Sequence, residues 1–227
     1  MPLWRRGSAD RREDKTMQDR RISFQSAMRA SGLAAAWLIL AGATAAQAHH
    51  PMGGTTPTTF MHGLLSGFGH PIIGIDHLAF IAAMGIAVGV AGLSLALPVM
   101  FVAASSLGVA LHVAGLGLPA AEIAVAVSVV CAGALIAWGG AVPAAGWGAL
   151  FAIAGLFHGY AFGETVAGAE PTPIAAYLVG LAVTQAVLAV LVALAVRRLT
   201  AEPVPRIAGA AIALIGIAVL AGHVMAA

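Results

Sequence analysis

Charged residues are scarce in this sequence. Only 9% of its 227 residues are charged and 60% are hydrophobic, whereas a soluble domain carries roughly 25% charged residues. This shortage excludes an ordinary soluble globular protein and predicts a chain embedded in a lipid bilayer. No polar stretch is long enough to separate two domains, so we expect one integral membrane domain.

Cysteine is almost absent, and basic residues are rare beyond the start of the chain. The single cysteine, Cys131, excludes an internal disulfide, and its place in an apolar run predicts a small core residue. Eight of the eleven Lys and Arg residues precede residue 30, and beyond residue 48 three arginines stand against five acidic residues. The basic overall balance therefore reflects targeting and does not predict binding to nucleic acid.

Two segments are expected to precede the mature protein. Residues 1–27 carry charges of both signs without apolar periodicity, which predicts a disordered extension or a start placed too early, with Met17 and Met28 as alternative first residues. Residues 28–48 have the pattern of a cleavable signal peptide, with a basic residue, an apolar core and a small-x-small cleavage site. The apolar core is shorter than the roughly 20 residues of a membrane span, which disfavours the alternative of an uncleaved first helix.

Cleavage after residue 48 leaves a histidine-containing segment, residues 49–70, at the new amino terminus, outside the cytoplasm. His49 and His50 are candidates to meet a transition-metal ion first, and a passive polar tail is the alternative. A membrane domain is expected over residues 71–227, because six apolar segments follow that are each long enough to cross a ~30 Å hydrocarbon core. They are Pro71–Ala91, Leu95–Leu116, Ala121–Trp138, Ala145–Val166, Pro173–Val196 and Ile207–Met225.

Short turns with Gly and Pro join these segments, so neighbouring segments are expected to run antiparallel. The predicted fold is an all-α integral membrane protein, a compact bundle of about six transmembrane helices that follows a cleavable signal peptide. The basic residues of the mature chain, Arg197, Arg198 and Arg206, lie between the fifth and sixth segments, and the positive-inside rule places this loop in the cytoplasm. We therefore expect a multi-pass protein of the bacterial inner membrane with a periplasmic mature amino terminus.

Three ionisable residues stand at the start of the first apolar segment. Because an ionisable group inside a membrane is costly, His70, Asp76 and His77 are interpreted as functional residues. Pro71 suits the first turn of a helix capped by Gly69 or His70, which would place both histidines on one helix face. The alternative is a capped helix start whose polar groups are wetted by interfacial water.

A second group of polar residues lies in the fourth segment. Gly155, Gly159 and Gly163 recur every four residues, which predicts a helix face that a neighbouring helix approaches closely. His158 lies just beside this face, and Glu164 lies about 120° around a regular helix from it. The two are therefore expected to share a site only if the helix loosens near Gly163, and a packing role for His158 is the alternative.

The predicted orientation brings these polar residues to one side of the membrane. Apart from Glu202, every histidine and carboxylate of the mature chain lies toward the outer side. Imidazole nitrogens combined with carboxylate oxygens suit a divalent ion such as nickel, cobalt or zinc. We expect the protein to bind a transported metal ion and to have no prosthetic group. Its other expected partner is the lipid bilayer, and a membrane bundle of this kind is compatible with a homo-oligomer. The candidate metal ligands are His70, Asp76, His77, His158 and Glu164, with His112 as a further candidate.

Both groups of residues are similar to motifs of the HupE/UreJ family of nickel/cobalt permeases. The motifs are HPxxGxDHL, from His70 to Leu78, and FHGYA, from Phe157 to Ala161, followed by Glu164. The resemblance extends from about residue 48 to the carboxyl end. It implies that the chain is a secondary permease for Ni²⁺ or Co²⁺ and not an enzyme, and nothing in the sequence resembles the P-loop of an ATPase.

Two other functions are weighed against transport. A membrane-embedded metal-dependent hydrolase also needs His and Asp in a helix bundle, but the sequence contains neither an HExxH box nor a nucleophile elbow. A metal-binding accessory protein for hydrogenase or urease maturation is the third interpretation. Many family members carry a second histidine where this chain has Phe162, so the ligand set and the choice between nickel and cobalt stay open.

Overall fold

Helices form nearly all of the regular structure. The computed structural model describes residues 55–199 and 203–226, which belong to the compact unit Gly42–Ala227, and these residues contain no strand. The predicted extension, signal peptide and first histidines therefore lie outside the described residues. In chain order the elements are α2 (Phe60–Ile73), α3 (Ile75–Val90), α4 (Ala96–Val113), α5 (Ala121–Trp138), α6 (Ala144–Gly163), the 3-10 turn η2 (Glu164–Val166), α7 (Pro171–Leu199) and α8 (Val204–Ala226).

Five of these helices are long and apolar enough to cross a membrane, and α2 with α3, bent by 75° at the break between them, adds a sixth if the pair is one span. The prediction of an all-α membrane bundle with about six spans is confirmed. Helix ends follow local signals: the Thr59 hydroxyl accepts a hydrogen bond from the N–H of His62 at the start of α2. Gly139, with a φ of 67°, ends α5 in the left-handed conformation that glycine tolerates.

The start of the first span differs from the prediction. Pro71 lies inside α2 and not in its first turn, and the helix continues to Ile73 before Gly74 leaves it in an extended conformation. A side chain at Gly74 would place its Cβ only 2.6 Å from Cδ2 of His77, so glycine is needed where the chain bends. The predicted cap at Gly69 or His70 is therefore wrong, because the chain breaks at the second of two helix breakers and not at the first.

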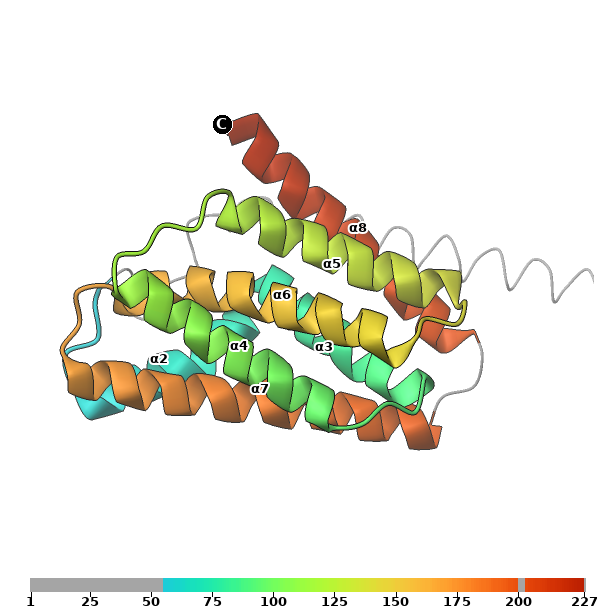
Figure 1. Ribbon diagram of the computed structural model, residues 1–227, viewed down its shortest axis with the longest axis horizontal. Coiled ribbons are helices and arrows are strands. Elements are labelled where there is room, and N and C mark those ends of the chain that lie inside the picture. Colours follow the sequence, from blue (N-terminus) through green and yellow to red (C-terminus); the bar gives the residue numbers. More distant parts are fainter. Residues whose placement is uncertain (1–54, 200–202, 227) are drawn as a thin grey trace, which may run out of the picture. The chain divides into compact units, whose positions relative to one another are not determined.

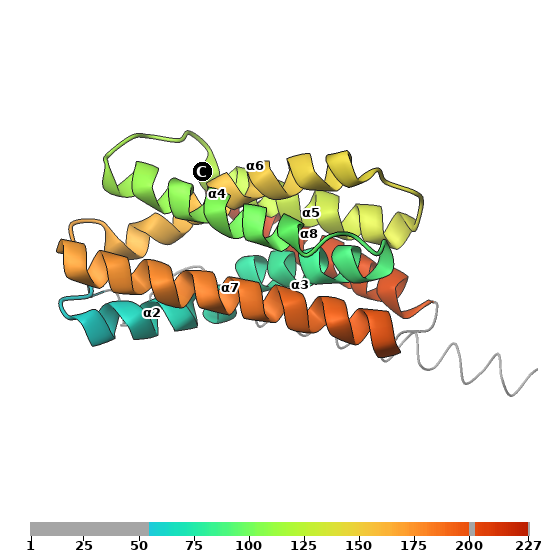
Figure 2. The same cartoon turned by 60° about the horizontal axis from the view of Figure 1, so that its bottom comes forward.

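The helices pack as pairs along their lengths. α4 lies along α6, α5 along α8, and α2 followed by α3 along α7, as both views show (Figures 1 and 2). The predicted glycine face of α6 is confirmed, since Gly155 and Gly159 pack against the backbone of α4 and Gly163 packs against His112. Such close approach of two helices is the usual use of small residues in membrane bundles.

The two ends of the bundle differ in charge. At one end, named here the Arg197 end, Arg197 donates to the carbonyl oxygens of Val88, in the last turn of α3, and of Leu93, just beyond this helix. Arg206 lies at the same end, against Gly139 at the close of α5. α5 and α7 begin at the opposite end, named the Glu122 end, and α4, α6 and α8 finish there.

The surface of the spans is apolar, as a lipid-facing surface must be. Large exposed side chains along the helices include Val99, Ile153 and Leu191. Cys131 is also exposed on α5, so the prediction that it is a core residue is wrong. An apolar run indicates that a segment is shielded from water. It does not show whether a given side chain of the segment contacts lipid or other protein residues.

Candidate functional site

Four of the predicted ligands meet inside the bundle. His70 comes from α2, Asp76 and His77 from the first turn of α3, and His158 from α6. Each is at most 4% exposed. We name these four residues the histidine cluster. The bend at Gly74 lies between His70 on α2 and His77 on α3, so it sets how these two rings face each other. Their centroids are 5.6 Å apart.

The contacts of His158 determine where the protons of two histidines lie. The Ser128 hydroxyl donates to the carbonyl oxygen of Val125 at 2.7 Å, so its oxygen accepts from Nε2–H of His158 at 2.9 Å. Neutral His158 then has its lone pair on Nδ1, which accepts from Nδ1–H of His77 at 2.9 Å. We infer that Nε2 of neutral His77 carries the lone pair that a metal ion requires.

His70 is oriented in a similar way by hydroxyl groups. Tyr177 donates its O–H to the carbonyl oxygen of Phe162 at 2.9 Å, so its oxygen accepts from Nδ1–H of His70, also at 2.9 Å. Thr165 Oγ1 lies 2.9 Å from the same nitrogen. The lone pair of neutral His70 is therefore on Nε2. Metal-binding histidines characteristically hold their other ring nitrogen in such a hydrogen bond.

Asp76 brings a carboxylate into the cluster. Its Oδ1 accepts a hydrogen bond from the backbone N–H of His77 at 2.8 Å and lies 4.0 Å from Nε2 of the same residue. The positive end of the α3 dipole favours a negative charge at this position, which offsets part of the cost of burying it. The described arginines lie far from it, at the Arg197 end.

Aromatic rings enclose the cluster. Phe162 is fully buried, and its ring centroid lies 4.9 Å from that of His70 and 4.1 Å from that of His77. Toward the Arg197 end, Phe80 packs on His158 at 4.7 Å and stacks on Phe101 at 5.3 Å. These rings exclude water, which strengthens every electrostatic interaction inside the cluster.

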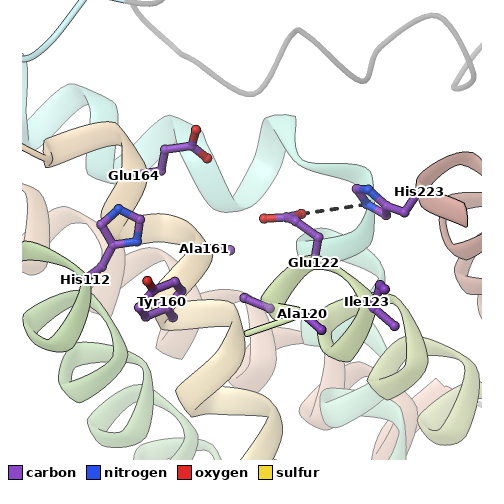
Figure 3. Close-up of a pocket in the computed structure, with 9 residues that line it drawn as sticks. His112, Ala120, Glu122, Ile123, Tyr160, Ala161, Glu164 and His223 are labelled. Atoms are coloured by element: carbon purple, nitrogen blue, oxygen red, sulfur yellow. Dashed lines mark ion pairs between the residues drawn. The ribbon is translucent and has the colours of Figure 1, made fainter. Parts of the chain in front are cut away.

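Two predicted ligands do not join this cluster. Glu164 is exposed in η2, and His112 lies at the end of α4. The helix does loosen after Gly163, but this turn directs Glu164 away from His158. Both line a separate cavity of about 400 Å³ at the Glu122 end, which we name the Glu122 pocket (Figure 3). Its walls are His112, Ala120, Ala121, Glu122, Ile123, Tyr160, Ala161, Glu164 and His223.

The described side chains do not form a metal-binding site in this conformation. Within residues 55–199 and 203–226, no group of three His, Cys, Asp or Glu side chains is close enough to hold one ion. The side chains of the histidine cluster would have to move closer together to hold one ion. His49 and His50 lie outside the described residues, so their predicted role stays a prediction.

Several polar residues of the interior are absent from the sequence-based prediction. Ser128, Thr165 and Tyr177 orient the histidines, and Gln185 is fully buried on α7, where Nε2 donates to the Ser105 hydroxyl at 3.1 Å. The Gln185 Oε1 has no hydrogen-bond partner among the described residues. The signal that could have identified them is a polar side chain in an apolar span, which requires a partner inside the bundle.

Comparison with known proteins agrees with the two motifs. The family model described as HupE / UreJ protein matches residues 36–219. No curated protein and no solved structure gives a significant match to the chain. The match covers most of the chain and includes the histidine cluster and every residue of the Glu122 pocket except His223. The chain therefore belongs to the HupE/UreJ family.

Proposed function

We propose that the protein is a secondary permease that takes up a divalent transition-metal ion, Ni²⁺ or Co²⁺, through the histidine cluster. The observation that carries this proposal is the burial of Asp76 among three oriented imidazoles in the interior of a membrane bundle. Ionisable groups at such a depth are costly and generally mark an ion path. Nitrogen and carboxylate donors suit these borderline ions.

The charge of the cluster matches this cargo. Asp76 supplies one negative charge, and the neutral imidazoles of His70 and His77 supply nitrogen lone pairs without adding positive charge. The groups are not yet gathered around one point, so binding has to draw them together. His70 and Asp76 lie on opposite sides of the bend at Gly74, where no side chain caps α3. We infer that a change in this bend adjusts the cluster to an ion and later releases it.

The orientation belongs to the same proposal. The Arg197 end faces the cytoplasm and the Glu122 end faces the periplasm of a bacterial cell, because the described basic residues gather at the former. Reporter fusions after residues 117, 169 and 227 are expected to report a periplasmic location, and a fusion after Arg198 a cytoplasmic one. A cytoplasmic carboxyl end would contradict this orientation.

The functional test is uptake of radiolabelled Ni²⁺ and Co²⁺ by cells that express the full chain, with and without a competing divalent ion. We expect saturable uptake above that of cells without the protein, competed by the other transition-metal ion more strongly than by Mg²⁺. A protein that only assists hydrogenase or urease maturation would restore the activity of those enzymes without any increase in ion uptake. That result would contradict the permease.

A substitution at Phe162 is expected to change metal preference. Phe162→His places an imidazole between His70 and His77 at a fully buried position. We expect the half-saturating concentration of Ni²⁺ or Co²⁺, or the ratio between the two, to change by roughly tenfold, as changes beside a metal site commonly do. The measurement is competitive uptake of both ions at equal membrane abundance.

Phe157→His is the matched control for this substitution. It adds the same imidazole to α6, but Phe157 makes no ring contact with the histidine cluster among the described residues. Its uptake is expected to equal that of the wild type. Identical metal preference in the wild type and in Phe162→His would show that position 162 does not face the ion.

A further inference from the structure

The Glu122 pocket is built from four helices and is separate from the histidine cluster. It lies between the ends of α4 and α6, the start of α5 and the end of α8, and no residue of the cluster lines it. In Figure 3, His112 and Glu164 lie on one side of the pocket, and Glu122 and His223 lie on the other. The carboxylate of Glu122 points into the space between these two sides. The Glu122 and His223 side chains are 3.7 Å apart.

The chemistry of the pocket walls selects for a cation. Two carboxylates and two imidazoles face the cavity, and its walls contain no Lys or Arg. With neutral imidazoles the pocket carries two negative charges. A concave surface of one sign with low-dielectric walls concentrates ions of the opposite sign. The pocket is therefore suited to attract cations to this end of the bundle.

His112 forms the wall of the pocket on the side of α4. Its ring lies 4.6 Å from that of Tyr160, and its Nδ1 is buried without a hydrogen-bond partner among the described residues. Buried ring nitrogens are normally satisfied by protein, water or an ion. Because this nitrogen has almost no accessible surface, a molecule in the pocket reaches only the rest of the ring unless the side chain turns.

The size of the pocket indicates the state of the ion. No three ligand side chains in the described part of the chain can reach one ion, and the cavity measures about 400 Å³. At about 30 Å³ per water molecule, this volume holds an ion together with its first hydration shell. The carboxylates then bind through water and discriminate by charge more than by the identity of the metal.

A thin wall separates the pocket from the histidine cluster. Ala161 and Glu164 line the pocket, whereas their neighbours Phe162 and Thr165 contact His70 on the other side. One turn of α6 together with η2 thus touches both sites. An ion in the pocket lies next to the elements that enclose the cluster.

We propose that the Glu122 pocket captures hydrated divalent cations and delivers them to the histidine cluster. This inference rests on the proposed function, because it gives the pocket a place in the path of the transported ion. The pocket first attracts ions according to their charge. The histidine cluster then selects among them according to the identity of the metal. Glu122 and Glu164 supply the attraction, and His112 and His223 form the walls.

Uptake by the Glu122→Gln variant tests the inference. The Glu122 side chain is 48% exposed, so its amide is expected to be tolerated in folding. We expect the half-saturating concentration of Ni²⁺ or Co²⁺ to rise roughly three- to tenfold, with the maximal rate near that of the wild type, since electrostatic concentration changes capture and not the later steps. High ionic strength should reduce the difference between variant and wild type.

Glu170→Gln is the matched control, because Glu170 is an exposed carboxylate that does not line the pocket. Its half-saturating concentration is expected to equal that of the wild type. An equal rise in both variants would show a general effect of surface charge and overturn the capture site. An unchanged half-saturating concentration in Glu122→Gln would also overturn it.

A binding measurement separates this inference from the proposed function. Cobalt(II) chloride is titrated into the purified full chain by calorimetry, with and without excess magnesium chloride. We expect a weak class of binding that Mg²⁺ removes, that Glu122→Gln weakens and that Asp76→Asn retains. Absence of uptake by the wild type would contradict the permease, whereas weak binding unaffected by Glu122→Gln would overturn the capture site alone.

Discussion

Asp76→Asn is expected to abolish most Ni²⁺ and Co²⁺ uptake while the protein still accumulates in the membrane. In the wild type, Oδ1 of Asp76 accepts a hydrogen bond from the backbone N–H of His77 at 2.8 Å. The side-chain oxygen of asparagine can accept the same hydrogen bond, so the start of α3 is preserved. What is lost is the negative charge that stabilises a divalent ion in a dry interior. Because changes in or beside a metal site cost roughly 10–100-fold in affinity or activity, uptake at sub-saturating ion should fall by that factor.

The opposite outcome is equally informative. A carboxylate that serves only the helix dipole contributes about 0.3–1 kcal/mol, so its loss would lower abundance slightly and leave transport intact. Uptake is therefore compared at matched membrane abundance, measured by immunoblot, with Glu170→Gln as a control that removes a carboxylate from an exposed site. Normal transport by Asp76→Asn would show that the histidine cluster is not the ion path.

The architecture was predictable because membrane spans depend on the composition of a segment. An apolar run of about 20 residues satisfies its backbone hydrogen bonds only as a helix, and this is true before any tertiary contact forms. The predicted third segment, Ala121–Trp138, has the same bounds as α5, and four others differ by a few residues at their ends. The first segment was predicted to begin at Pro71, whereas the helices α2 and α3 begin at Phe60. The glycine face of α6 followed from the same local periodicity.

The bend in the first span was not predictable in the same way. Pro71 and Gly74 both interrupt a helix, and local propensity does not decide which of them ends it. In the structure α2 continues past Pro71, and His77 packs against Gly74, where a side chain would not fit. The juxtaposition of His70 and His77 thus comes from a bend, whereas the sequence suggested a shared helix face.

The separation of the ligands into two sites depends on tertiary packing. The 120° angle between His158 and Glu164 already argued against a shared site, and the structure places Glu164 in the Glu122 pocket. Glu122 and His223 lie far apart in the sequence, and only the packing of α5 on α8 brings them together. The predicted orientation placed Glu122 and His223 near the outer side of the membrane. The sequence alone could not show that they lie next to each other.

The second large effect is expected at the contact between α4 and α6. A Cβ at Gly159 would lie 2.0 Å from the carbonyl oxygen of Ser105, and the obstacle is backbone, which cannot rotate away. Gly159→Ala therefore forces the two helices apart. Overpacking costs about 1–3 kcal/mol or more, which outweighs the gain of about 1 kcal/mol in helix propensity. We expect a several-fold lower membrane abundance and a lower unfolding temperature in detergent.

Gly148→Ala, on the same helix, provides the matched control. Its Cβ would make ordinary contacts, 3.6 Å from Cδ2 of Leu97 and 3.7 Å from Cε of Met100, so only the propensity gain remains. Its stability is expected to equal or exceed that of the wild type. The purified Gly159→Ala protein that remains should lose Co²⁺ binding only in proportion to the unfolded fraction, since Gly159 is not a ligand. Equal stability of the two variants would show that α4 and α6 do not approach each other through Gly159.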